Sequence, residues 1–218
     1  MRRILTFLAL VAAIGGLGAC GADNVWAPDE QVEAVRYQDD GPPTLTLFTV
    51  ISNRSGAGAH SGLMVSGSQR VLFDPAGTWN HPYLPERHDV HFGITDAAVD
   101  FYVDYHARVT YNVVRQDIVV SPEVAEMALR LVQENGPVAK AMCSTSVTAI
   151  LRQLPGFESI PQSAFPKRPM KAFGQLPGVV ETVTYDDDPD ENGYILARGI
   201  ARLDGVEAEI WQADAAEQ

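Results

Sequence analysis

Two short apolar runs on either side of a turn restrict how this chain can fold. The runs cover residues 62–65 (Gly-Leu-Met-Val) and 71–73 (Val-Leu-Phe), and the cluster Ser-Gly-Ser-Gln at 66–69 separates them. Apolar runs of this length around such a cluster predict a β-hairpin. His60 opens the first strand and Asp74 closes the second, so antiparallel pairing brings these two polar residues to the same end of the hairpin.

The register of this hairpin decides whether His60 and Asp74 can interact. A loop with an odd number of residues puts the two side chains on one face of the sheet. An even number puts them on opposite faces unless a β-bulge intervenes. The sequence leaves both registers open. If the two residues share a face, the Asp74 carboxylate can orient the His60 imidazole, as the third member of a catalytic triad does.

The first 19 residues predict an export signal that is not part of the fold. Arg2 and Arg3 give a positive start, residues 4–17 are uncharged and largely apolar, and small residues follow. This order is typical of a secretory signal peptide. The sequence Leu-Gly-Ala before Cys20 resembles the bacterial lipobox, where cleavage leaves a lipidated cysteine at the start of the mature chain. The alternative is an ordinary signal peptide in which Cys20 is incidental.

A lipid on Cys20 predicts a membrane-anchored protein on the periplasmic face of the bacterial cell envelope. Gly21 follows in place of the aspartate that retains lipoproteins at the inner membrane of many bacteria, which favours the outer membrane. The chain has 16 Lys and Arg against 28 Asp and Glu, a net charge of -12. We therefore expect no nucleic-acid partner, and we expect membrane attachment to depend on the lipid rather than on charge.

Changes in composition divide the chain into four parts. Residues 1–19 form the signal peptide, and residues 20–43 are polar, end in Asp-Asp-Gly-Pro-Pro and predict a tether. Residues 44–185 are expected to form the main domain, and strands within residues 186–218 are expected to pack on that same domain. Hydrophobic residues make up 46% of the chain, which is enough to build a core.

Cys143 is the one thiol left if a lipid occupies Cys20. In an oxidising compartment such a cysteine is a buried passenger, a partner in an intermolecular disulfide or a reactive nucleophile. Residues 144–146 (Ser-Thr-Ser) are typical of helix starts. Apolar residues then recur at helical spacing, at Val147, Ile150, Leu151 and Leu154. Cys143 therefore lies at or just before a helix N-terminus, where free N–H groups favour a thiolate and can bind an oxyanion.

Other patterns predict further helices and strands. Ser121 and Pro122 begin a helix that Gly136 and Pro137 end. Residues 95–106 predict a second helix, with Thr95 or Asp96 as its cap and Ala98, Phe101, Tyr102 and Tyr105 facing inward. Strands are expected at 108–114, 118–120, 179–185, 194–202 and 206–211, and the proline-rich residues 155–177 are expected to form an irregular connection.

Both motifs resemble those of the NlpC-type papain-like cysteine hydrolases. His60-Ser-Gly-Leu-Met-Val, the turn and Val-Leu-Phe-Asp74-Pro-Ala resemble the histidine hairpin of that family. Cys143-Ser-Thr-Ser-Val-Thr-Ala-Ile-Leu resembles its nucleophile helix. Here His60 precedes Cys143, the reverse of the standard order. The chain is therefore similar to the circularly permuted branch, which includes lecithin:retinol acyltransferase-like proteins, over about residues 45–154.

This resemblance implies a papain-like α+β fold, in which an antiparallel sheet packs against the helix that carries Cys143. The implied chemistry is hydrolysis of an amide or ester bond, or acyl transfer, through a thioester on Cys143. His60 would act as the base and Asp74 as the third polar residue. The substrate would be a peptidoglycan stem peptide or a lipid acyl chain. The alternative is a non-catalytic envelope lipoprotein that uses the same scaffold for binding or assembly, and the oligomeric state stays open.

Residues 78–91 contain Trp79, Tyr83, three histidines and two prolines. One interpretation is an ordinary surface loop with a packed tryptophan, and the other is a rim whose aromatic side chains line the substrate groove. The spacing His88-x-x-His91 next to Asp89 could suggest a metal site, but no second ligand cluster accompanies it. We therefore expect no metal.

The acidic residues 186–193 imitate the start of a calcium-binding loop. Glu191 stands where such a loop needs glycine, and Ala197 stands where it needs a bidentate glutamate. A solvated acidic turn is the better interpretation. The sequence also contains no glycine-rich phosphate loop, and we expect no cofactor.

Overall fold

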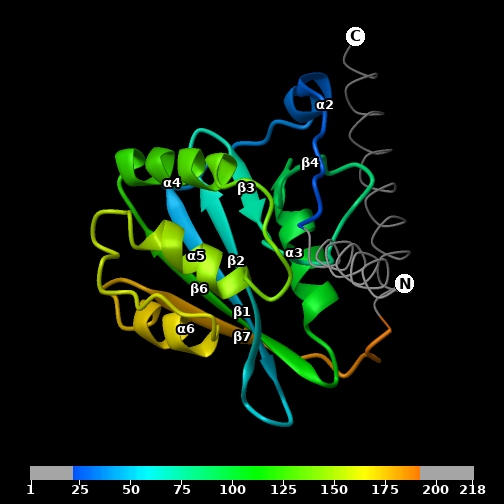
Figure 1. The fold of residues 1–218 in the computed structure, drawn as a ribbon, viewed down its shortest axis with the longest axis vertical. Helices are drawn as coiled ribbons and strands as arrows, with labels where there is room; N and C mark the ends of the chain where they lie inside the picture. Colours follow the sequence, from blue (N-terminus) through cyan, green and yellow to red (C-terminus); the bar gives the residue numbers. More distant parts are fainter. Residues whose placement is uncertain (1–21, 192–218) are drawn as a thin grey trace, which may run out of the picture.

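A seven-stranded antiparallel sheet lies at the centre of the structure (Figure 1). This computed structural model describes residues 22–191 of the 218-residue chain. The strand order in the sheet is β4-β5-β3-β2-β1-β6-β7. The strands are β1 (Thr44–Ser52), β2 (Gly58–Ser66), β3 (Arg70–Phe73), β4 (Glu86–Arg87), β5 (Val90–Phe92), β6 (Tyr111–Val119) and β7 (Val180–Thr184). The expected α+β class with an antiparallel sheet is confirmed.

Helices cover both faces of the sheet, with α4, α5 and α6 on one face and α3 on the other (Figure 1). Successive strand residues point to opposite faces, so β2 contributes to two cores. Leu63 belongs to the core under α4, α5 and α6, and Met64 to the core under α3. The helices are α2 (Asp29–Ala34), α3 (Asp96–His106), α4 (Pro122–Glu134), α5 (Cys143–Leu151) and α6 (Lys167–Phe173).

The predicted hairpin forms, and its loop has the odd number of residues that the interaction requires. Ser66 pairs with Arg70 across the three-residue loop 67–69, and Leu63 pairs with Phe73. Continuing this register puts residue 74 opposite residue 62. His60 lies two residues before residue 62 in β2, so its side chain is on the same face of the sheet as that of Asp74.

The three predicted helix starts also form. The Ser121 hydroxyl accepts a hydrogen bond from the Val124 N–H at the start of α4, and Pro122 is the first helical residue. The Thr95 hydroxyl accepts one from the Ala98 N–H at the start of α3. Cys143 is the first residue of α5, as its sequence context indicates.

The segment expected to be a tether differs from that expectation, because part of it packs on the domain. It contains α2, and Ala27 and Val32 are buried in the core. The Ala27 N–H donates to the carbonyl of Glu86, and the Arg87 side chain donates to the carbonyl of Ala27. Two buried apolar residues in an otherwise polar stretch are a weak pattern, which is why composition alone indicates a spacer.

Two further expectations need correction. The separate strands expected at 108–114 and 118–120 are one strand, β6, whose polar middle is paired with neighbours: Gln116 donates to Glu181 of β7. The irregular connection expected at 155–177 contains α6. Its prolines fit there because Pro166 and Pro169 lie at the helix start, where a missing N–H costs no intrahelical hydrogen bond.

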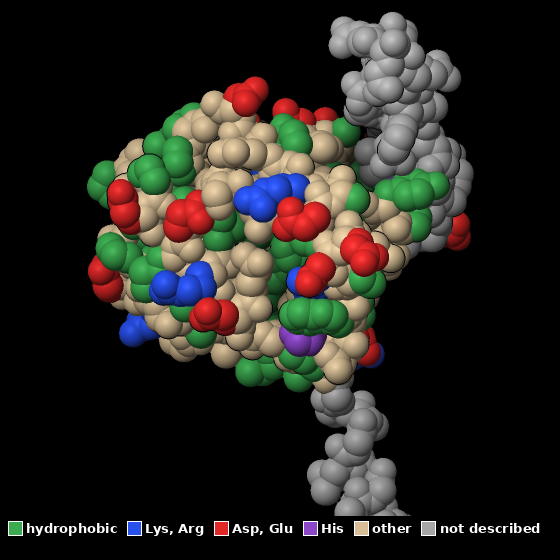
Figure 2. All heavy atoms as spheres, turned by 90° about the horizontal axis from the view of Figure 1, so that it is seen from above, with side chains coloured by type: hydrophobic (Ala, Val, Ile, Leu, Met, Phe, Trp, Pro, Cys, Tyr) green, Lys and Arg blue, Asp and Glu red, His purple; other side chains and the backbone are tan. Residues whose placement is uncertain are grey.

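Several expectations lie outside the described residues: the signal peptide at 1–19, lipidation of Cys20, and strands at 194–202 and 206–211. None of the helices between residues 22 and 191 has the length and apolar character needed to cross a bilayer. Acidic side chains are spread over the face shown in Figure 2, with basic ones between them and no continuous basic patch.

Candidate active site

The end of the β2–β3 hairpin brings His60 and Asp74 into direct contact. Nε2 of His60 lies 2.6 Å from Oδ1 of Asp74. The same carboxylate oxygen accepts a hydrogen bond of 2.7 Å from the hydroxyl of Tyr102, which α3 supplies. The Asp74 side chain is fully buried, so its charge depends on these partners and not on water.

Two glycines leave room for the Asp74 carboxylate. A Cβ atom on Gly62 would lie 2.5 Å from the Tyr102 hydroxyl oxygen and 3.4 Å from Oδ1 of Asp74. A Cβ atom on Gly77 would overlap the other carboxylate oxygen, Oδ2. The hairpin and the loop after it can therefore close around Asp74 only with glycine at both positions.

Cys143 begins α5 on the other face of the sheet, and its thiol meets His60 at the end of β3. Burial acts to raise the pKa of Cys143. A hydrogen bond with His60, the charge of His60 and the backbone N–H groups of Ser61 and Ser144 outweigh burial, so the thiol pKa lies below its ordinary value. Because Nε2 of His60 faces Asp74, Nδ1 is the ring nitrogen left for the sulfur.

Asp74 and Cys143, the two partners of His60, make this histidine a strong base. Burial acts to lower its pKa, but the charge and hydrogen bond of Asp74 and the contact with Cys143 raise it to about 10. Burial likewise acts to raise the pKa of Asp74, and His60 holds that pKa below its usual range. The arrangement therefore favours a thiolate, an imidazolium and a carboxylate in a row at neutral pH.

Asp89 connects the segments that carry Asp74 and Cys143, a role that the sequence pattern did not indicate. Its backbone carbonyl accepts the Asp74 N–H at 2.8 Å. Its carboxylate accepts the Ala76 N–H at 2.9 Å and the Val138 N–H, in the loop before α5, at 2.8 Å. Burial raises the pKa of this carboxyl, and these hydrogen bonds act against that rise. Nothing in the sequence around Asp89 indicates these contacts, because its partners lie in other parts of the chain.

Backbone strain is concentrated around these segments. Four non-glycine residues between 22 and 191 have a positive φ: Ala76 (56°), His88 (47°), Asp89 (65°) and Ala141 (66°). Ala76 lies two residues after Asp74, and Ala141 lies two residues before Cys143. Left-handed backbone at non-glycine residues costs free energy and gathers at functional sites.

His106 is a second histidine at the site that the sequence did not single out. Its ring is parallel to that of His60, with 5.6 Å between centroids and 4° between planes. Nδ1 of His106 lies 2.8 Å from the backbone carbonyl oxygen of Tyr102. Burial lowers the pKa of His106 to about 4, so the ring is neutral at neutral pH.

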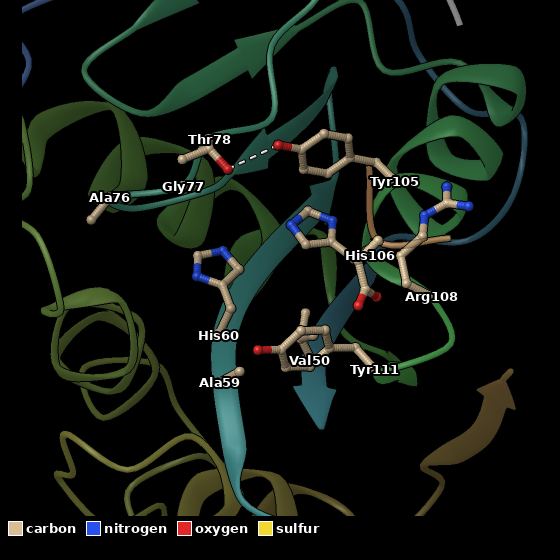
Figure 3. Close-up of a pocket in the computed structure, with 11 residues that line it drawn as sticks. Val50, Ala59, His60, Ala76, Gly77, Thr78, Tyr105, His106, Arg108 and Tyr111 are labelled. Atoms are coloured by element: carbon tan, nitrogen blue, oxygen red, sulfur yellow. Dashed lines mark hydrogen bonds between the residues drawn. The ribbon is translucent and has the colours of Figure 1, made fainter. Parts of the chain in front are cut away.

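A cavity of about 230 Å³ opens beside the two histidine rings (Figure 3). One side of it is the loop after Asp74, where the Thr78 hydroxyl lies 2.9 Å from that of Tyr105. The lining residues are Val50, Ala59, His60, Ala76, Gly77, Thr78, Tyr105, His106, Arg108, Tyr111 and Asp190. Cys143 is not among them, so the cavity borders the Cys143–His60 pair on the side of His60.

The tryptophan of segment 78–91 packs in the core, and neither Trp79 nor the exposed Tyr83 lines the cavity. Trp79 is buried and makes ring contacts with His91 and Tyr102. His88 lies 2.8 Å from the Asn24 side chain, while His91 is buried, so the two do not face a common point. No group of possible metal ligands among residues 22–191 includes either histidine.

Two such groups do occur in that part of the chain. Ligand atoms of His60, Asp74 and His106 lie within 4.8 Å of one another, but the first two are already hydrogen bonded together. Asp104, Asp186 and Asp188 form the other, and all three surround the guanidinium of Arg108. The Arg108 guanidinium already pairs with that acidic cluster, so contacts within the protein account for both groups.

Comparison of the chain with models of known protein families, with curated proteins and with solved structures finds no match in any of the three. The geometry of the candidate site is therefore the main guide to function.

Proposed function

We propose that this protein is a cysteine hydrolase or acyltransferase that acts on amide or ester bonds through a thioester on Cys143. The observation that carries the proposal is the sequence of contacts from Cys143 to His60 to Asp74. A nucleophile, a base and a group that orients the base are the parts that such chemistry needs. The fold we propose is papain-like, of the circularly permuted NlpC type, since the antiparallel sheet and the cysteine helix support that assignment.

In the first step the Cys143 thiolate attacks the acyl carbon of the substrate. A carbon–sulfur bond forms, and the bond from that carbon to the leaving nitrogen or oxygen breaks. His60 gives its proton to the leaving atom, so the amine or alcohol departs neutral. The first N–H groups of α5 have no intrahelical partners and can stabilise the oxyanion that forms on the carbonyl oxygen.

In the second step His60 removes a proton from water or from an acceptor hydroxyl or amine. The resulting nucleophile attacks the thioester, and Cys143 leaves as a thiolate. Water gives hydrolysis, and another acceptor gives acyl transfer. Asp74 holds the imidazole through Nε2 in both steps, which keeps Nδ1 directed at the sulfur.

We also propose that the protein acts at the bacterial cell envelope, anchored by a lipid on Cys20. The export signal at 1–19 and the lipobox resemblance support this location. The site would face peptidoglycan stem peptides or membrane lipids, and the substrate is one of these two classes. No nucleic-acid partner is proposed, because the net charge of -12 opposes binding to phosphate.

Selective alkylation tests the activated thiol. Iodoacetamide is applied at about pH 6, where an ordinary thiol with a pKa of about 8.5 is almost entirely protonated. We expect Cys143 to react much faster than free cysteine, and His60→Ala to abolish the excess. Asp74→Asn is expected to reduce it. Equal rates in the wild type and in His60→Ala would rule out the enzyme and leave the binding or assembly lipoprotein as the function.

A second test looks for the covalent intermediate. The purified full-length protein is incubated with envelope fractions and its intact mass is measured. We expect an acyl adduct on Cys143 that is absent from Cys143→Ser, and its mass identifies the acyl group as a peptide or a lipid chain. Absence of any adduct under conditions where iodoacetamide reacts would count against turnover of an envelope substrate.

A further inference from the structure

The cavity beside His60 lies where a leaving group must lie if Cys143 attacks a substrate. The leaving atom has to reach the imidazole that protonates it, so it departs on the histidine side of the reacting carbon. His60 lines the cavity and Cys143 does not (Figure 3). A volume of about 230 Å³ is several times the roughly 30 Å³ that one water molecule occupies, so a small organic group fits.

His106 presents a hydrogen-bond acceptor to this cavity. A carbonyl oxygen can only accept, so the contact between Nδ1 and the Tyr102 carbonyl means that Nδ1 carries the hydrogen. The ring is neutral, which leaves Nε2 with a lone pair and no hydrogen. Residues 22–191 offer this nitrogen no hydrogen bond. A ligand group next to Nε2 must therefore be a donor.

Charges around the cavity favour a positive ligand. The Asp190 carboxylate is part of the lining. Arg108 also contributes to it, but its guanidinium lies 3.2, 3.9 and 3.4 Å from the carboxylates of Asp104, Asp186 and Asp188. Three carboxylates thus contact one guanidinium, and the Asp190 carboxylate, which accepts hydrogen bonds from the backbone N–H and the hydroxyl of Thr110, adds a fourth negative charge on this side of the site. The positive charge of His60 is similarly balanced, because a carboxylate and a thiolate are its partners.

We propose that this cavity binds the leaving group of the substrate and selects one that carries an ammonium group. The inference rests on the proposed function. As the carbon–sulfur bond forms, the bond from the acyl carbon to the leaving atom breaks and that atom takes the proton of His60. An ammonium elsewhere on the departing part donates to Nε2 of His106 and to Asp190. The acceptors are present before the substrate arrives, so the preference requires no rearrangement of the site.

Three aryl acetates that differ only in the leaving phenol test this. They are 4-(aminomethyl)phenyl acetate, 4-(hydroxymethyl)phenyl acetate and 4-acetoxybenzoate, which carry a positive, a neutral and a negative group. Acetylation of Cys143 in the full-length protein is followed by intact mass, and each rate is divided by the rate of the same ester with 2-mercaptoethanol. We expect the aminomethyl ester to be favoured about tenfold over the hydroxymethyl ester and the benzoate to be slowest.

Variants locate the preference. Asp190→Asn removes the charge and keeps the shape, and it is expected to lower the advantage of the aminomethyl ester to about threefold or less. His106→Phe removes the acceptor and keeps a ring, and it is expected to lower that advantage as well. Asp100→Asn makes the same charge change on the exposed side of α3 and is expected to leave all three rates unchanged.

The outcomes separate this inference from the proposed function. Acetylation of Cys143 with equal normalised rates for the three esters, or with the benzoate favoured, would overturn the ammonium preference while supporting the thiol chemistry. An advantage that survives unchanged in both Asp190→Asn and His106→Phe would place its source outside the cavity and also overturn the inference. Acetylation no faster than in Cys143→Ser would overturn both.

Discussion

Asp74 shows how single residues determine the candidate site. Its buried carboxylate touches His60 and Tyr102, and the space it occupies exists because positions 62 and 77 are glycine. The sequence could indicate that His60 and Asp74 lie at one end of a hairpin. It could not indicate the Tyr102 hydrogen bond, because that contact joins the hairpin to a helix on a different part of the chain.

Gly62→Ala tests this packing. The new Cβ would lie 2.5 Å from the Tyr102 hydroxyl oxygen, so Tyr102 or Asp74 must move. We expect alkylation of Cys143 to slow about tenfold and the free energy of unfolding to fall by about 1–3 kcal/mol. Gly41→Ala is the matched control, since the atoms nearest to its Cβ belong to the Asp39 side chain and lie no closer than 3.6 Å. An unchanged alkylation rate in Gly62→Ala would contradict the account of this contact.

Two histidines with lowered pKa values, the buried His91 and the half-buried His106, predict how stability depends on pH. Burial lowers the pKa of His91 and of His106 to about 4, whereas both would titrate near 6.5 in the unfolded chain. The unfolded state therefore binds more protons as pH falls from 6.5 towards 4, and the stability present above pH 6.5 is lost across this window. Each group contributes on the order of 3 kcal/mol at most.

Urea unfolding at several pH values between 4 and 7 measures this loss. The range follows from the pKa values of the two histidines, which fall from about 6.5 when unfolded to about 4 when folded. We expect His91→Leu to have a smaller loss of unfolding free energy across the window than the wild type, because one buried titrating group is gone. The same pH dependence in both proteins would show that His91 is not buried in its neutral form.

At the scale of helices and strands, features set by neighbouring residues could be predicted from the sequence. Features set by contacts between residues far apart in the sequence could not. Ser121 and Thr95 cap helix starts that form as predicted, because a cap is satisfied within one turn of chain. Helix α5 begins at Cys143 as predicted but without a side-chain cap, since the cap-type residues 144–146 lie inside its first turn. Strand β6 was divided in two because its polar middle is stabilised by neighbours far along the chain. Asp89 was considered only as part of a loop with a possible metal site, since nothing nearby in sequence reveals that it joins two other loops.

Asp89→Asn tests whether the β4–β5 turn sets the relative position of Asp74 and Cys143. An amide offers one acceptor where two backbone N–H groups need one each, so its NH₂ group would face one of them. We expect alkylation of Cys143 at about pH 6 to fall about tenfold, and its pH midpoint to rise towards that of a free thiol.

Glu126→Gln is the matched control for Asp89→Asn. The Glu126 carboxylate also joins a loop to a helix, because it accepts hydrogen bonds from the backbone and hydroxyl of Ser68, but it does not touch the site. We expect its alkylation profile to match the wild type. A midpoint that shifts equally in both variants, or in neither, would deny Asp89 a positioning role.

The whole molecule places its nucleophile and its base in different layers. Cys143 belongs to α5, which packs with α4 and α6, whereas Asp74 and His60 lie on the face covered by α3. The two groups meet where β3 ends, so the site exists only when both helical layers are docked on the sheet. Neither half of the chain contains the complete site.

This arrangement predicts that thiol reactivity and global structure are lost in one transition. Trp79 is buried under α3, so its fluorescence reports the layer that does not carry Cys143. In a urea titration we expect the excess alkylation rate of Cys143 and the Trp79 signal to fall with the same midpoint, since both layers share the strands of one sheet. Trp26→Phe removes the signal of an exposed tryptophan without touching either core, and Trp211→Phe removes the third tryptophan of the chain, which lies outside the described residues. Loss of reactivity at a lower urea concentration than the fluorescence change would mean that the layer carrying α5 undocks on its own. The site would then be assembled by a local equilibrium and not by the fold as a unit.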